Sequence, residues 1–202
     1  MTLDLPRPRV ILASGSPRRH RLLEMIGIHH EVCPTNVDES CVGGERPAAH
    51  AERLARSKAA AIGETDAVVI GSDTVVVVDG DVLGKPRDTD DAERMLRRLS
   101  GRSHVVMTGV AVRWRDRSVS GVEEVGVTFR ALADEEIRAY IATGEPMDKA
   151  GAYGIQGYGA TIVERVDGDY FAVMGLALNR MVRLMEAVGL EYRFGAVQRR
   201  AG

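Results

Sequence analysis

Cysteine is scarce in this sequence, which contains only Cys33 and Cys41 among its 202 residues. Two cysteines cannot build a disulfide scaffold, so the fold must rely on a buried apolar core. The adjacent residues His29 and His30 would point to opposite faces of a strand, and the other histidines have no partner at a metal-ligand spacing. The pattern therefore predicts neither a zinc site nor a cysteine nucleophile.

Aromatic residues make up only 4% of the sequence, and there is no excess of basic residues. The formal net charge is −2 and the isoelectric point is near 6.2. Binding of single-stranded nucleic acid needs aromatic stacking platforms and a basic surface, so a general nucleic-acid binder is not expected. No apolar run approaches the 18 or so residues that span a bilayer, and residues 1–9 lack a signal-peptide core. We expect a cytoplasmic protein without a membrane partner.

The remaining composition is that of a globular protein, with 45% hydrophobic residues and 22 glycines. Strand-like and helix-like segments alternate, but hairpin signals interrupt them, which predicts a mixed, partly antiparallel α/β sheet in one domain or two closely packed lobes. An Asp79-Gly80 turn is a type I′ hairpin signal, and a second hairpin is predicted at Asp167-Gly168. The predicted strands lie at 10–13, 30–35, 67–78, 103–114 and 118–130, and the predicted helices begin near 17, 47, 88, 134 and 176. The basic tail after Gly189 is predicted to fray.

The segment Ser14-Gly15-Ser16-Pro17-Arg18-Arg19 joins the first apolar strand to a helix. Ser16 suits the N-cap position and Pro17 the first helical position. Arg18 and Arg19 oppose the positive potential of a helix N-terminus, a conflict that disappears if an anion binds there. Free N–H groups, the hydroxyls of Ser14 and Ser16 and two guanidiniums predict a phosphate site, the alternative being an ordinary tight turn with solvated arginines.

Asp73 interrupts an apolar strand, between Val68-Val69-Ile70 and Val75-Val76-Val77-Val78. Burying an unpaired carboxylate is costly, so either a bulge turns Asp73 toward solvent or it faces a cation or a substrate. The second interpretation makes Asp73 a general base or a metal ligand, with Thr74 as a hydrogen-bonding neighbour.

Lys58, Lys85 and Glu39 could add phosphate-binding or metal-binding groups, although the sequence around each one alone favours a structural or solvated side chain over a functional one. The small-residue loop that starts at Asp148-Lys149 and runs to Gly157 allows close backbone approach to a ligand. Its Gln156 carries an amide that can both donate and accept, as reading a base edge requires. The alternative for this segment is a flexible surface loop.

These motifs together resemble the Maf family of nucleoside triphosphate pyrophosphatases, also called septum formation inhibitors, over residues 9 to 188. The matching segments are the Ser14–Arg19 turn, Ser72-Asp73-Thr74, Gly84-Lys85-Pro86 and the loop from Asp148 to Gly157. The resemblance implies a single domain over residues 1–202 with a long twisted mixed sheet, flanking helices and two lobes around a central cleft, as in inosine-triphosphate pyrophosphatases. It also implies hydrolysis of a nucleoside triphosphate to the monophosphate and pyrophosphate with a divalent metal (Mg, Mn or Co).

By the family pattern, Asp73 matches the proton acceptor, whereas Arg18, Thr74 and Gln156 match positions linked to substrate choice. The sequence of the loop from Asp148 to Gly157 resembles that of the subgroup that acts on dTTP and UTP. Modified pyrimidine nucleotides are left open as further substrates. Asp73 and Glu39 are the expected metal ligands, and a homodimer is a family expectation. Two alternatives stay open: a noncatalytic nucleotide-binding regulator of cell division, and a pyrophosphatase of the sister subgroup that prefers 7-methyl-GTP.

Overall fold

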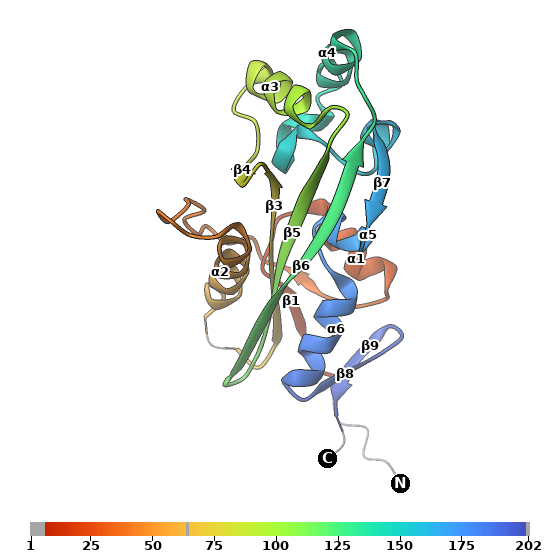
Figure 1. The fold of residues 1–202 in the computed structure, drawn as a ribbon. Coiled ribbons are helices and arrows are strands. Elements are labelled where there is room, and N and C mark those ends of the chain that lie inside the picture. The colour runs from red at the N-terminus through yellow and green to blue at the C-terminus, as the bar shows by residue number, and fades with distance from the viewer. Residues whose placement is uncertain (1–6, 64, 201–202) are drawn as a thin grey trace. The chain divides into compact units, whose positions relative to one another are not determined.

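The computed structural model describes residues 7–63 and 65–200 (Figure 1). The sequence folds into alternating strands and helices with a group of short 3-10 helices (η) near residue 150. In chain order the elements are β1 (Val10–Leu12), α1 (Pro17–Met25), β2 (Glu31–Val32), α2 (Pro47–Ala60), β3 (Val68–Val78), β4 (Asp81–Leu83), α3 (Thr89–Leu99), β5 (Ser103–Trp114), β6 (Arg117–Phe129), α4 (Asp134–Ala142), η1 (Glu145–Asp148), η2 (Ala150–Ala152), η3 (Gly157–Thr161), β7 (Val163–Asp167), α5 (Tyr170–Met174), α6 (Leu178–Ala187), β8 (Leu190–Arg193) and β9 (Ala196–Arg199).

The main sheet is mixed, as the sequence predicts. Its strand order is β2-β1-β3-β5-β6-β7, with β4 paired to β3. Strand β1 is parallel to both β2 and β3, whereas β3–β4 and β6–β7 are antiparallel. The predicted mixed α/β sheet with flanking helices is confirmed.

Contacts between residues divide the chain into two compact units, neither of which is one continuous segment. Unit 1 comprises the described residues of 1–73, 108–123 and 175–202, and unit 2 comprises 74–107 and 124–174. Strands β3, β5 and β6 each continue from one unit into the other. The predicted cleft stays a prediction.

Helix α2 packs very closely on the sheet in unit 1, because glycines and alanines line the contact. A Cβ atom on Gly71 would lie 2.2 Å from the carbonyl oxygen of Ala55, and one on Gly109 would lie 2.2 Å from that of Ala51. Real Cβ atoms are never that close, so only glycine fits at these two strand positions. A small-residue core surrounds the contact and consists of Ile11, Ala13, Ala55, Ala59, Ala67, Val69 and Ala111.

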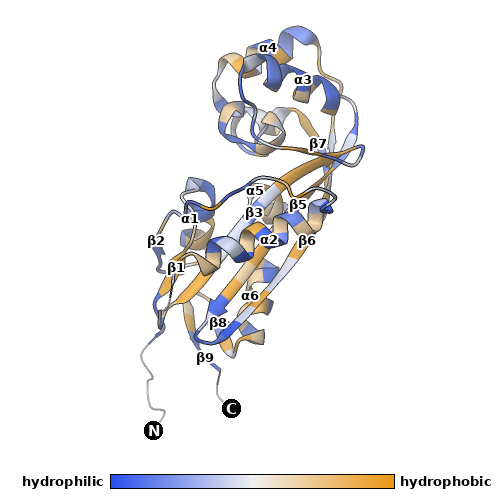
Figure 2. Ribbon diagram, turned by 90° about the vertical axis from the view of Figure 1, so that its left-hand side faces the viewer, coloured by the Kyte–Doolittle hydropathy of each residue, from blue (hydrophilic) through white to orange (hydrophobic). Residues whose placement is uncertain are grey.

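Unit 2 has its own apolar core beneath two short amphipathic helices. Leu96 and Leu99 of α3, Ile137 of α4 and Phe129 of β6 are fully buried. In Figure 2 most of β3 is hydrophobic, whereas α3 and α4 contain several hydrophilic residues. Asp88 caps α3 by accepting a hydrogen bond from the N–H of Asp91 at 2.7 Å. The sequence therefore supplies both the apolar face and the start signal of this helix.

The turn signals of the sequence had two outcomes. Asp79 and Gly80 both have positive φ (53° and 84°), as a type I′ turn requires, and they join β3 to β4. The predicted hairpin at Asp167-Gly168 is wrong, because β7 ends at Asp167, pairs with the earlier strand β6, and is followed by α5.

The predicted fraying after Gly189 is also wrong. Residues 190–199 form the hairpin β8–β9, in which Leu190 and Val197 are buried. The predicted strand at 30–35 shrinks to the two residues of β2.

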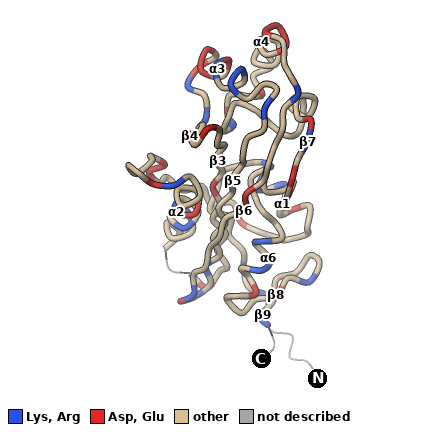
Figure 3. Tube along the Cα trace, in the orientation of Figure 1, with Lys and Arg blue, Asp and Glu red and all other residues tan. Residues whose placement is uncertain are grey.

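Charged residues of both signs are distributed over the described chain (Figure 3). Within the described ranges, no helix is long and apolar enough to cross a bilayer.

Candidate active site

Lys58 lies between two carboxylates in unit 1. Its Nζ atom is 2.7 Å from Oδ1 of Asp73 and 2.6 Å from Oε1 of Glu39. Lys58 is 7% exposed and Asp73 is 8% exposed, whereas Glu39 belongs to an exposed loop. The structure thus joins three of the residues that the sequence left individually ambiguous into one charged cluster.

The position of Lys58 follows from the close packing of α2. Lys58 lies in the last turn of this helix, on the face that also buries Ala51 and Ala55. Because Gly71 and Gly109 let the helix backbone approach the strands, the lysine side chain reaches the buried end of Asp73. The bulge alternative for Asp73 is therefore wrong, since its carboxylate is buried and faces a cation.

Arg19 does not present a free guanidinium at the start of α1. Its Nε donates to the carbonyl oxygen of Gly175 at 2.7 Å, and its Nη1 donates to Oγ of Ser14 at 3.0 Å. Burial lowers the pKa of Arg19, and the nearby charge of Asp73 counteracts this by favouring the cation. Arg19 and Ser14 therefore hold the strand-to-helix turn in place, and Arg19 adds positive potential near Asp73.

Ser72 fixes the backbone beside Asp73. Its Oγ is fully buried and lies 2.9 Å from the carbonyl oxygens of both Gly109 and Gly175. The hydroxyl has one hydrogen, so it donates to one of these carbonyls at a time. The same Gly175 carbonyl also accepts from Arg19, which links the β3 segment around Asp73 to the α1 turn.

The other predicted residues of this region occupy the positions that the sequence indicates. Ser16 is the N-cap residue of α1, although its side chain forms no capping hydrogen bond, and its own N–H donates to Oγ of Ser14 at 3.2 Å. Arg18 is partly buried in the first turn of α1, and its charge lowers the pKa of Arg19 further. Thr74 follows Asp73 directly and is the first residue of unit 2.

Glu145 organises the loop of unit 2 that the sequence singled out. Its carboxylate accepts hydrogen bonds from the hydroxyl of Tyr140 (2.8 Å) and from the N–H groups of Tyr158 (2.9 Å) and Gly159 (3.0 Å). Burial acts to raise the pKa of Glu145, but these donors and the charge of Lys149 outweigh it and lower the pKa. Residues 151–155 of the segment are buried, so the alternative of an exposed surface loop is wrong.

Sequence reasoning missed Glu145, because nothing in its local pattern distinguishes it from a solvated acid. The sequence feature related to this contact is Gly157: in the structure, a Cβ atom added to it would lie 2.3 Å from Oε2 of Glu145. Gly157 also has a φ of +67°, so the glycine is required both by its conformation and by the carboxylate beside it.

The predicted substrate residues of unit 2 lie on and around this loop. Lys149 donates to the carbonyl oxygen of Glu145 and pairs with Asp148, with 2.6 Å between Nζ and Oδ1. Gln156 is exposed immediately before η3. Lys85 is exposed after β4, and the neighbouring Gly84 carbonyl accepts from the N–H of Gly151 at 3.0 Å, which ties the two glycine-rich segments together.

An aromatic cluster of Tyr153, which belongs to the loop, His104 and Phe129 packs together in unit 2. Tyr153 donates to or accepts from Nε2 of His104 at 2.8 Å, and both rings pack edge-to-face with Phe129. Burial lowers the pKa of His104 to about 4 and raises the pKa of Tyr153 well above its usual value. Both groups are neutral near pH 7, so they act as packing and hydrogen-bonding groups.

Asp73 and Glu39 have the donor chemistry that a small divalent cation prefers. Mg²⁺ is usually bound by one or two protein carboxylates together with substrate phosphates and water, and these two carboxylates meet that number. Within the described residues, no group of three acidic, histidine or cysteine side chains gathers to hold a metal by itself. The residues therefore fit a cation that arrives with a phosphate ligand.

Cys41 lies nearer to a histidine than the sequence suggested. Its Sγ is 4.0 Å from Nε2 of His50, and Nδ1 of that ring is 3.1 Å from Oε2 of Glu45. The hydrogen bond from Arg53 is the main cause that lowers the pKa of Glu45 to about 2. Spacing alone could not reveal this contact, because Cys41 comes from an irregular loop.

Comparisons with known proteins give a consistent result. The family model described as "Maf-like protein" matches residues 9–188. A protein of Symbiobacterium thermophilum named dTTP/UTP pyrophosphatase is 51% identical over 183 residues, which cover 90% of this chain and 94% of that protein. A protein of Vibrio cholerae with the same name is 51% identical, covering 88% of this chain and 96% of the relative. Among solved structures, the Ham1 protein of Staphylococcus aureus matches with a TM-score of 0.45 and 16% identity, covering 77% of this chain and 79% of that one.

Proposed function

Because the chain belongs to the Maf family, we propose that it is a nucleoside triphosphate pyrophosphatase that hydrolyses dTTP and UTP to the monophosphate and pyrophosphate. Relatives that carry the name dTTP/UTP pyrophosphatase align with about nine-tenths of the chain. The structural observation that carries the proposal is the buried carboxylate of Asp73 beside the ammonium of Lys58.

Asp73 is proposed to act as the general base that accepts a proton from the attacking water. A carboxylate that is buried and held by a fixed partner is oriented without a further loss of side-chain freedom. Lys58 compensates the negative charge of Asp73 in the absence of substrate, and in its presence supplies positive charge for the phosphates. Ser72 keeps the backbone of Asp73 in place through the Gly109 and Gly175 carbonyls.

The phosphates are proposed to bind at the start of α1. The backbone N–H groups at the N-terminus of α1, the hydroxyls of Ser14 and Ser16 and the charge of Arg18 are suited to an anion. Arg19 contributes as a positioning residue, since its guanidinium already holds Ser14 and Gly175. Lys85 adds a further cation on its loop.

A divalent cation is proposed as the cofactor, held by Asp73 and Glu39. When bound, it would neutralise charge on the phosphate oxygens and so lower the barrier to attack by water. Glu39 is exposed and belongs to a loop, so its carboxylate can leave Lys58 at a lower cost than the buried Asp73.

Base choice is proposed to depend on the loop that Glu145 organises. Gln156 is exposed on this loop and its amide can pair with an adjacent acceptor and donor of a pyrimidine. Thr74 adds a hydroxyl next to Asp73, and Asp148 and Lys149 form the ion pair that flanks the loop. We further propose a cytoplasmic protein that acts on free nucleotides, without nucleic-acid or membrane partners, and that forms a homodimer.

The test is pyrophosphate release from dTTP, UTP, CTP, GTP and 7-methyl-GTP with Mg²⁺, Mn²⁺ or Co²⁺. We expect the highest kcat/KM with dTTP and UTP, and no release in the presence of a chelator. Asp73→Asn, which keeps the size of the side chain, should lower kcat by a factor on the order of 10²–10⁴. Asp116→Asn changes an exposed aspartate in the β5–β6 turn and is the matched control.

Three results would contradict the proposal. A preference for 7-methyl-GTP would place the chain in the sister subgroup. Nucleotide binding without any pyrophosphate release would favour the noncatalytic regulator of cell division. Turnover by Asp73→Asn at the wild-type rate would remove Asp73 from the role of general base.

A further inference from the structure

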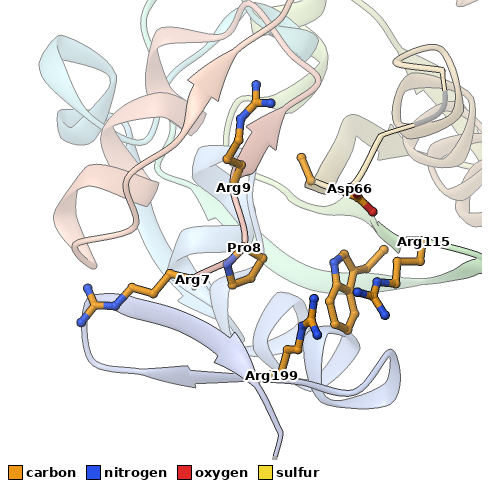
Figure 4. A pocket seen from close by; sticks show the side chains of 8 residues that line it. Arg7, Pro8, Arg9, Asp66, Arg115 and Arg199 are labelled. Carbon is orange, nitrogen blue, oxygen red and sulfur yellow. The ribbon is translucent and has the colours of Figure 1, made fainter. Parts of the chain in front are cut away.

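A strongly basic pocket lies in unit 1, lined by none of the candidate active-site residues. It has a volume of about 240 Å³. Four arginines, one tryptophan and one carboxylate contribute to its walls: Arg7, Arg9, Arg115, Arg199, Trp114 and Asp66 (Figure 4). Pockets that bury drug-sized molecules measure roughly 300–1,000 Å³, so this one suits a small ligand.

The pocket lies at the opposite end of the strands from the candidate active site. Arg9 precedes β1 and Asp66 precedes β3, and these parallel strands are in register, with Val10 opposite Val68. Ser14 follows the other end of β1, and Asp73 lies within β3, three residues after Ile70, the register partner of Leu12. At about 3.3 Å per residue, Asp66 and Asp73 are separated by roughly 20 Å along β3.

Two of the arginines are placed on one aromatic ring. The guanidinium carbons of Arg115 and Arg199 lie 4.8 Å and 5.6 Å from the ring centre of Trp114, which is 8% exposed. Arg115 follows β5 and Arg199 ends β9, so two distant parts of the sequence bring like charges to the same indole. Figure 4 shows both side chains directed into the pocket, whereas Arg7 extends away from it.

The positive charge of this pocket is poorly compensated. Arg9 forms a bidentate ion pair with Glu31, at 2.8 Å, which leaves Arg7, Arg115 and Arg199 against the single carboxylate of Asp66. Within the described part of the chain, no carboxylate is within ion-pair distance of Arg115 or Arg199. Other arginines do have such partners, among them Arg98, Arg102 and Arg130.

We propose that this pocket binds a phosphate dianion, either inorganic phosphate or the phosphate group of a monoester. The two arginines directed into the pocket outnumber its single carboxylate, Asp66, by one positive charge, and Arg7 adds a further cation at the wall; a phosphate monoester carries about −1.5 to −2 at pH 7. Guanidinium groups bind phosphate through two parallel N–H···O bonds. Cation–π contact with the indole of Trp114 fixes the orientation of the guanidinium groups of Arg115 and Arg199. The faces of Trp114 are engaged with the arginines, so recognition is directed at the phosphate and not at an aromatic base.

The fluorescence of Trp114 tests this directly, because it is the only tryptophan in the sequence. Inorganic phosphate and thymidine monophosphate, added without metal at constant ionic strength, should each cause a saturable change, whereas thymidine should cause none. Equal affinities of the two phosphates would identify inorganic phosphate as sufficient, and tighter binding of the nucleotide would identify a monoester as the preferred source. A response that sodium chloride reproduces at the same ionic strength would overturn the proposal.

Removal of the two arginines provides the second test. The double variant Arg115→Gln/Arg199→Gln should bind phosphate at least tenfold more weakly by calorimetry, a measurement that does not depend on the altered tryptophan signal. Arg183→Gln, an exposed arginine of α6, is the matched control and should bind like the wild type. Unchanged affinity in the double variant would place the phosphate elsewhere, and binding of an oligonucleotide but of neither small phosphate would identify a polyanion surface. Either result would overturn the proposal.

Discussion

Replacement of Lys58 by methionine should destabilise the protein strongly, because it leaves the buried carboxylate of Asp73 without its cation. Methionine keeps the apolar stem of lysine out to Cε, so the packing of this α2 side chain changes little. The two charges lie 2.7 Å apart and both residues are less than a tenth exposed. Removal of one partner of a buried ion pair costs about 3–5 kcal/mol. For a chain of about 200 residues, 1 kcal/mol corresponds to about 2–4 °C in Tm, so we expect Tm to fall by at least about 6 °C.

A double-mutant cycle separates the ion pair from other effects of the substitution. Asp73→Asn combined with Lys58→Met removes both charges, and the double variant should regain at least about 1 kcal/mol of unfolding free energy relative to the sum of the single variants. Lys85→Met, which changes an exposed lysine, is the matched control and should stay within about 0.5 kcal/mol of the wild type. Urea unfolding followed by circular dichroism gives all four free energies. A loss below about 1 kcal/mol for Lys58→Met, or strict additivity in the cycle, would refute the reasoning.

Four further predictions follow from the described contacts. Arg18→Ala should raise KM for dTTP with Tm unchanged or slightly higher, because its charge opposes the dipole of α1; a lower Tm with normal kinetics would contradict this. Gln156→Leu should lower kcat/KM for dTTP and UTP by roughly 5- to 150-fold, because a polar contact worth about 1–3 kcal/mol is lost. An unchanged order of base preference in this variant would show that Gln156 does not recognise the base. Gly71→Ala should cost about 1–3 kcal/mol in urea unfolding, since its Cβ would meet the Ala55 carbonyl at 2.2 Å. The unfolding free energy should fall by up to about 3 kcal/mol between pH 6.5 and pH 4. In the folded protein the pKa of His104 is about 4 and the ring stays neutral, whereas in the unfolded chain the same ring takes up a proton over this range. In His104→Gln this part of the pH dependence should disappear.

Turn chemistry could be predicted from sequence only where the dipeptide and its flanking strands agreed. Asp79-Gly80 lies between two apolar strands, and both residues adopt the positive φ that the type I′ turn needs. Asp167-Gly168 has the same composition, but the segment after it forms α5, so the strand before it pairs with β6. Which strands pair is decided by contacts distant in sequence, and a dipeptide does not contain that information.

The candidate site was partly predictable for a related reason. Asp73 was recognisable because a carboxylate in an apolar strand needs a partner, but the sequence could not show that Lys58 is this partner. That pairing depends on how closely α2 approaches β3, which is fixed by Gly71 and Gly109. The sequence also could not show which of Arg18 and Arg19 is buried. Neighbouring residues on a helix point about 100° apart, and in the structure only Arg19 is buried.

The contacts of Glu145 have a consequence for how this family can diversify. All the groups that bind its carboxylate, together with Lys149, lie between residues 140 and 159, so one continuous stretch contains both the loop and the acid that shapes it. Such a stretch can be exchanged between relatives as one segment, provided that its contacts with Gly84 and His104 are kept, while the pair of Lys58 and Asp73 is inherited unchanged. Under the proposed function, a new nucleobase preference is then accessible by grafting about twenty residues, with the hydrolytic chemistry retained from the parent.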